Sequence, residues 1–241
     1  MEYYIYIIAS LLILPGLIYG MYAQASVNKT FNAFKTIEST CGKSASEVAR
    51  LMLDQKGLFD VKIVKINGNL TDNYNPKTKT LSLSESTFNS KSVAAIGVAA
   101  HEVGHAYQHS EGYLPIKIRT AFVPIVNIGS ALFWPLIIIG ILLMLSASLA
   151  HAGEIVVWIG VALYGSSTLF CLITVPVEYN ASNRALAALR SLNILEANEI
   201  PMADKVLKAA AKTYVAALIV SALYFIRFFM YIFLLLGKNR D

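Results

Sequence analysis

Residues 93–109 read VAAIGVAAHEVGHAYQH, an apolar run followed by two histidines that lie four positions apart. Positions i and i+4 share one face of an α-helix, so the imidazoles of His101 and His105 can converge on one tetrahedral zinc ion. Glu102 lies beside them, too far round the helix to bind the same ion easily, but within reach to act as a general base. The stretch predicts an HExxH metal helix of the zincin type over residues 93–109.

The apolar residues before the motif indicate that this helix is buried. Neighbouring histidines and a glutamate are costly to bury unless they are paired or bind a metal. The alternative is a solvated polar helix end, which the apolar residues 93–100 disfavour.

A catalytic zinc site also needs a third protein ligand and an open position. Glu178 is the stronger candidate, because it follows the apolar stretch 155–177 directly and acidic residues at membrane depth are expensive and usually functional. An interfacial ion pair between Glu178 and Arg184 is the alternative. His109 is eight residues after His101 and turns away by about 80°, so a supporting or surface role is expected. Groups that could support a ligand or donate to an oxyanion, unranked, are His109, Tyr179 and Asn180.

The composition is that of a membrane protein. Of 241 residues, 56% are hydrophobic and 15% charged, against about 25% charged in soluble domains. A large soluble helical core would require several uncharged helices packed around one another. Crossing a bilayer takes roughly 20 apolar residues. Stretches of that kind span residues 4–22, 124–149, 155–177 and 214–236. The first has no Lys or Arg before it, which favours a retained anchor over a signal peptide.

The predicted fold class is therefore a mostly α integral membrane protein, with about four transmembrane helices and a small α+β insertion. The insertion covers residues 25–120, and a helical segment with the third ligand covers 178–213. Within the insertion, a capping box at Ser44–Glu47 predicts a helix that ends at Gly57. Strands are expected at 61–66 and 80–83, and residues 81–83 are a candidate edge for pairing with an extended substrate.

Lys and Arg residues near the crossings place the segments 25–120 and 178–213 on the cytoplasmic side of a cell membrane. Arg227 interrupts the last apolar stretch, either as the partner of an acid in the bundle or by extending to the interface. No basic cluster with interleaved aromatic residues indicates nucleic-acid binding. Cys41 and Cys171 lie in segments of different character, so no disulfide is expected between them.

Two runs of sequence, residues 94–106 and 176–182, resemble the YugP-type zinc-dependent membrane peptidases of bacteria, and residues 70–76 and 213–217 are similar too. The resemblance implies a membrane-embedded gluzincin. It also implies the roles of the site residues: His101, His105 and Glu178 as ligands, and Glu102 as base. The chain departs from the family pattern, which has His and Asp at the places of Asn73 and Asn75, and usually Asp at that of Asn180.

The predicted function is a zinc-dependent membrane endopeptidase acting on membrane or membrane-proximal proteins. The alternative is a metal-binding, non-catalytic membrane scaffold or chaperone partner, which would have no need for Glu102 as a base. A channel or transporter is disfavoured, because the apolar stretches contain few charges and no paired interrupted helices.

Overall fold

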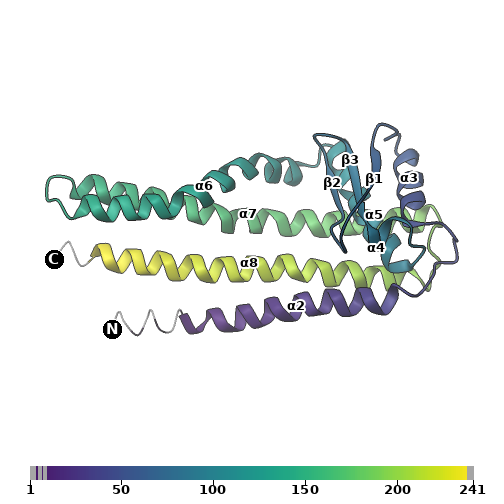
Figure 1. The fold of residues 1–241 in the computed structure, drawn as a ribbon, viewed down its shortest axis with the longest axis horizontal. Coiled ribbons are helices and arrows are strands. Elements are labelled where there is room, and N and C mark those ends of the chain that lie inside the picture. The colour runs from purple at the N-terminus through teal and green to yellow at the C-terminus, as the bar shows by residue number, and fades with distance from the viewer. Residues whose placement is uncertain (1–3, 5–6, 8–9, 238–241) are drawn as a thin grey trace. The chain divides into compact units, whose positions relative to one another are not determined.

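The structure, a computed structural model, describes residues 4, 7 and 10–237 of the chain. These residues are mostly helical, with one small sheet (Figure 1). They fall into two compact units. The apolar unit takes its described residues from Met1–Met21, Ile118–Val175 and Tyr214–Asp241, and the α+β unit consists of Tyr22–Lys117 and Pro176–Thr213.

Within the described part of the chain, three helices are long and apolar enough to cross a membrane, and each contributes residues to both units. They are α6 (Leu114–Met144), α7 (Ala150–Ser191) and α8 (Ile200–Gly237). Their large apolar side chains are often exposed, as at Leu142, which is 60% accessible. Such an apolar surface suits contact with lipid. The helical backbone satisfies its own polar groups, as a bilayer requires.

The remaining expected crossing, residues 4–22, includes residues 5–6 and 8–9, which lie outside the described part of the chain. The described residues show α2 over Ile13–Phe34, well beyond the expected end at residue 22. A count of four crossings therefore stays a prediction. Lys238 and Arg240, two basic residues that follow the last apolar stretch on the side opposite to the one predicted to be cytoplasmic, also lie outside the described residues.

Two glycines let α6 and α7 approach closely within the apolar unit. A Cβ on Gly140 would lie 2.8 Å from the carbonyl oxygen of Gly153, and one on Gly153 would lie 2.5 Å from that of Gly140. In a bilayer the hydrophobic effect does not drive helices together, so helix association depends on close packing. Small residues at a crossing allow the two backbones to pack closely. On α8, the Arg227 guanidinium lies 5.4 Å from the ring centroid of Tyr224, within cation–π range.

The helix bounds differ from the apolar segments in the sequence. α6 begins at Leu114 and ends at Met144, whereas the apolar stretch covers 124–149. α7 continues past residue 177 to Ser191, with Pro176 inside it. Apolarity marks where lipid or core surrounds a helix, not where its hydrogen bonding stops. Glu178 therefore lies within a continuous helix rather than after its end.

The capping box confirms the start of α3 (Ala45–Gln55). Glu47 N donates to Ser44 Oγ at 3.3 Å, and Ser44 N donates to a Glu47 carboxylate oxygen at 2.7 Å. Gly57, with φ +70°, lies just beyond the helix end, where a left-handed residue is expected.

The sheet contains one strand that the sequence did not predict. Its order is β1 (Lys62–Ile66), β3 (Thr80–Ser84), β2 (Asn73–Asn75); β3 is parallel to β1 and antiparallel to β2. Leu81 is paired with Ile63 on one side and Tyr74 on the other. The prediction that residues 81–83 form an open edge is thus wrong, because β3 is the central strand.

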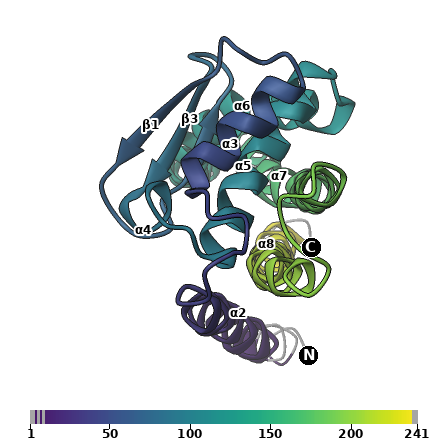
Figure 2. The same ribbon diagram turned by 90° about the vertical axis from the view of Figure 1, so that its right-hand side faces the viewer.

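The predicted metal helix corresponds to α5 (Val93–Ser110), and Ser92 caps it by accepting a hydrogen bond from Ala95 N at 3.2 Å. Helices α3 and α5 lie side by side (Figure 2). A short helix, α4 (Glu85–Phe88), precedes α5. Fully buried side chains from α3, α5, α7, α8 and β3 form the core of the α+β unit; the largest include Met52, Leu53, Leu81, Leu83, Ile96, Val103 and Leu189. The histidine pair is thus carried by a helix anchored in a packed core.

Candidate metal centre

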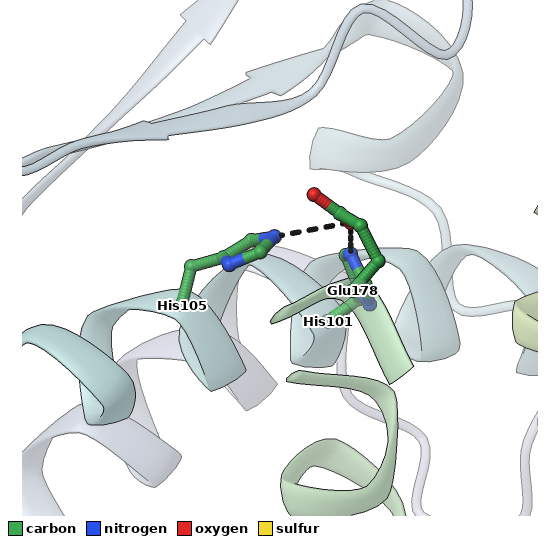
Figure 3. Close-up of side chains that lie close together, drawn as sticks. All are labelled: His101, His105 and Glu178. Carbon is green, nitrogen blue, oxygen red and sulfur yellow. Dashed lines mark hydrogen bonds and ion pairs between the residues drawn. The ribbon is translucent and has the colours of Figure 1, made fainter. Parts of the chain in front are cut away.

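Three side chains from two helices converge on one point (Figure 3). His101 and His105 project from α5, and Glu178 projects from α7. The Nε2 atoms of His101 and His105 lie 3.1 Å and 3.4 Å from the same Glu178 carboxylate oxygen. One ligand atom from each side chain can be chosen so that all three lie within 4.8 Å of one another. Glu178, predicted from its place after an apolar stretch, is therefore at the histidine pair.

A close crossing of α5 and α7 produces this convergence. A Cβ on Gly104 would overlap the carbonyl oxygen of Ala181 and lie 3.1 Å from its carbonyl carbon. Gly104 lies directly before His105, and Ala181 lies three residues after Glu178. The glycine thus lets the two backbones touch at the level of the three side chains.

Each imidazole has a hydrogen-bonding partner on its other ring nitrogen. His105 Nδ1 lies 3.0 Å from Gln108 Oε1, and His101 Nδ1 lies 3.1 Å from Ser182 Oγ. An amide oxygen can only accept, so His105 carries its proton on Nδ1 and its Nε2 lone pair is available. The Ser182 hydroxyl can accept in the same way. Partners of this kind fix the tautomer and the ring orientation of metal-binding histidines.

The donor set and its spacing fit zinc. Two imidazole nitrogens and one carboxylate oxygen form a ligand set of catalytic zinc sites, with the fourth position open. A tetrahedral ion with bonds of about 2.1 Å separates its ligand atoms by about 3.4 Å, close to the 3.1 Å and 3.4 Å observed here. The Glu178 residue is only 2% exposed, and a buried carboxylate is stabilised by positive charge at this point.

Glu102 is half-buried on α5, between the two histidines in sequence. Burial raises the pKa of its carboxyl, although His105 and His101 act in the opposite direction. A carboxylate with a raised pKa accepts a proton more readily near neutral pH, as a general base must.

The remaining predicted residues differ in their surroundings. His109 lies outside the converging triad, with its ring centroid 5.9 Å from that of Tyr74 on β2. Tyr179 is 42% exposed. Arg184, weighed as a partner of Glu178, donates to Asn180 Oδ1 at 2.6 Å and forms an ion pair with Glu111.

Two of the three departures from the family pattern have local structural roles. Asn73 donates to the Thr71 carbonyl at 3.0 Å, and Asn75 accepts from Lys77 N at 2.9 Å. Asn180 uses its Oδ1 atom as an acceptor, an atom that aspartate also has.

Sequence reasoning missed Gln108 and Ser182, the partners of the two imidazoles. A signal for both exists in the spacing. Gln108 is three residues after His105 and Ser182 four after Glu178, so each shares a helix face with a predicted ligand.

Comparison with known proteins agrees with the donor set. Residues 9–233 match the model of a family described as "Putative neutral zinc metallopeptidase". The chain is 40% identical over 211 residues to the "Putative membrane protease YugP" of Bacillus subtilis (strain 168). The aligned region covers 88% of this chain and 90% of that protein. No solved structure matches the chain. The family implies Zn²⁺ as the metal, and three donors of the right kind and spacing are present to hold it. The chain thus belongs to this family of neutral zinc metallopeptidases.

Proposed function

We propose that the protein is a zinc-dependent endopeptidase embedded in the membrane, which hydrolyses peptide bonds of membrane or membrane-proximal proteins. His101, His105 and Glu178 hold the metal, and Glu102 is the general base. The observation that carries the proposal is the approach of two imidazole Nε2 atoms to one buried carboxylate oxygen, with both Nδ1 atoms already hydrogen-bonded.

The chemistry divides between the metal and the chain. A bound zinc ion lowers the pKa of a water ligand to about 7 and polarises a carbonyl group. Glu102 accepts the proton of the attacking water and passes it to the leaving amine. Gln108 and Ser182 hold the imidazoles in place, so the histidines need little reorganisation during the reaction.

The experiment measures cleavage of membrane proteins by the purified protein. The protein is purified in detergent and reconstituted into liposomes together with membrane proteins extracted from the cells that produce it. A chelator is expected to abolish cleavage and added zinc to restore it, because removal of the ion removes the activated nucleophile. Fragments are detected by mass spectrometry. Zinc-loaded protein that cleaves nothing in this assay would favour the alternative, a non-catalytic metal-binding scaffold.

The place of Glu178 in α7 supports the proposal of a membrane-proximal substrate. The residue comes directly after the apolar stretch 155–177 of the same helix. Helices rise about 1.5 Å per residue, so the ligand is within a few ångström, along the helix, of apolar sequence. We assign the active site to the cytoplasmic face of a multi-pass protein, on the charge bias of the flanking segments. A membrane-impermeant thiol reagent that labelled Cys41 from outside intact cells would contradict this side.

An extended substrate is expected to pair with β2, the sheet edge that adjoins the metal helix. Tyr74 of β2 contacts His109 of α5, whereas β1 forms the opposite edge of the sheet. Extended peptides commonly add a strand to such an edge. Hydrogen exchange with a peptide hydroxamate, whose end group binds zinc, should show slower exchange at residues 73–75.

The other edge strand, residues 62–66, is the internal control for this exchange experiment and should be unaffected. Slower exchange at β1 alone, or at neither edge despite tight binding of the hydroxamate, would exclude pairing at β2.

A further inference from the structure

Gln108 is a fully buried polar side chain whose amide joins the two helices of the metal centre. Its Oε1 atom lies 3.0 Å from His105 Nδ1. Its Nε2 atom donates to the Val177 carbonyl at 2.8 Å and to Asn180 Oδ1 at 3.0 Å. Its residue exposure is 0%. Both ends of one amide are thus used, one on a histidine of α5 and the other on α7.

The two acceptors on α7 flank Glu178. Val177 precedes it and Asn180 is two residues after it, so the Gln108 amide group is tied to the turn that presents the carboxylate. Asn180 Oδ1 also accepts from Arg184 Nε at 2.6 Å, and Arg184 pairs with Glu111 at the C-terminal end of α5. The chain of contacts leaves α5 at Gln108 and returns to it at Glu111.

We propose that Gln108 is a positioning residue, which sets the orientation of His105 and holds it in register with Glu178. Its carbonyl oxygen selects the His105 tautomer with a free Nε2 lone pair, and its amino group holds the backbone next to Glu178. The inference rests on the proposed assignment of His105 and Glu178 as ligands. It adds that the spacing between them is maintained by a side chain that never touches the metal.

The physical reason is the cost of leaving buried polar groups without partners. Without the Gln108 amide, His105 Nδ1 and the Val177 carbonyl each lose a buried hydrogen bond, and the imidazole is free to rotate or change tautomer. Loss of such a partner typically reduces metal affinity or activity about 10- to 100-fold.

The experiment measures zinc affinity of the full-length protein in detergent, by competition with a chromophoric chelator. Gln108→Leu fills a similar volume without polar atoms and is expected to weaken zinc binding by about 10- to 100-fold. Gln108→Asn keeps an amide but is one methylene too short to reach both helices. It is expected to show the same loss and serves as the test where the leucine variant does not fold.

The matched control is Tyr107→Phe, at the neighbouring position of α5. The Tyr107 hydroxyl donates a buried hydrogen bond to the Met52 carbonyl at 2.6 Å, outside the metal centre. This variant also loses one buried hydrogen bond of the same helix, but it should bind zinc like the unchanged protein. Visible absorption of the Co²⁺-substituted proteins gives a second readout, because the bands depend on ligand geometry. Gln108→Leu should change this spectrum and Tyr107→Phe should not.

Unchanged zinc affinity and an unchanged Co²⁺ spectrum in folded Gln108 variants would overturn the inference while leaving the proposed function standing. An equal loss of affinity in Tyr107→Phe would overturn it as well, since the effect would then come from general damage to α5. Absence of zinc binding by the unchanged protein would overturn the proposed function itself.

Discussion

The Glu102→Gln variant is expected to lose peptidase activity by about 10²- to 10⁴-fold, the usual contribution of a general acid–base group, while it keeps its zinc. The amide has nearly the same shape as the carboxylate but cannot accept the proton of the attacking water. Glu102 is not one of the three converging donors, so its replacement leaves the ligand set intact. The measurement is the rate of substrate cleavage in liposomes, together with zinc content by elemental analysis.

The control for Glu102→Gln is Asp54→Asn, which also neutralises one acid. Asp54 forms a partly exposed i,i+4 ion pair with Arg50 on α3, and surface pairs contribute little to stability. Its activity should stay near that of the unchanged protein. Activity of Glu102→Gln within a few-fold of the unchanged protein would assign the base to another residue, and loss of zinc would show that Glu102 supports the metal instead.

The Glu178→Ala variant is expected to lose most of its zinc, where the unchanged protein should contain about one ion per chain, as a single site of three protein ligands predicts. Two imidazoles alone would remain of the ligand set. The loss in affinity should exceed the about 10- to 100-fold attributed to a supporting partner. Elemental analysis after dialysis against a weak chelator gives the metal content.

Glu199→Ala is the matched control, because Glu199 is another buried acid of the same unit. Its carboxylate accepts hydrogen bonds from Thr40 N and Glu196 N, both at 2.8 Å, and it is not part of the converging triad. The variant should lose stability but keep zinc. Zinc retained by Glu178→Ala would move the third ligand elsewhere, with His109 the next candidate from the sequence.

The convergence of His101, His105 and Glu178 was the most predictable part of the molecule. Two residues four positions apart share one face of any α-helix, so the sequence alone predicts that His101 and His105 point the same way. Glu178 could be found because an acid at the end of an apolar stretch is costly and therefore informative. The capping box at Ser44 and the first and third strands were predictable for a related reason, since their signals are local.

Features that depend on tertiary packing were not predictable. β2 consists of Asn73, Tyr74 and Asn75, and asparagine is depleted in strands. Its strand conformation comes from pairing with β3, and no local sequence pattern predicts that pairing. The sequence predicted a helical segment over 178–213 but not that its first part continues α7 without a break, because the apolar signal stops at residue 177 while the helical backbone does not.

The hydrogen-bonding partners of the imidazoles show the same limit. That each histidine needs an acceptor on its second nitrogen follows from metal-site chemistry. Which residue supplies it depends on how α5 crosses α7. Ser182 reaches His101 from the neighbouring helix, 81 positions along the chain, and only the crossing brings them together.

The contact between Gly104 and Ala181 means that the two middle positions of the H-E-x-x-H motif tolerate different residues. Position 103 needs only an apolar residue, because Val103 is buried in the core. Position 104 must lack a Cβ, because the carbonyl oxygen of Ala181 occupies that space. A genome search for H-E-x-G-H-x-x-Q, followed at the end of a later apolar segment by E-x-x-A-S, would therefore select chains with this helix crossing and pass over most chance matches to the shorter motif.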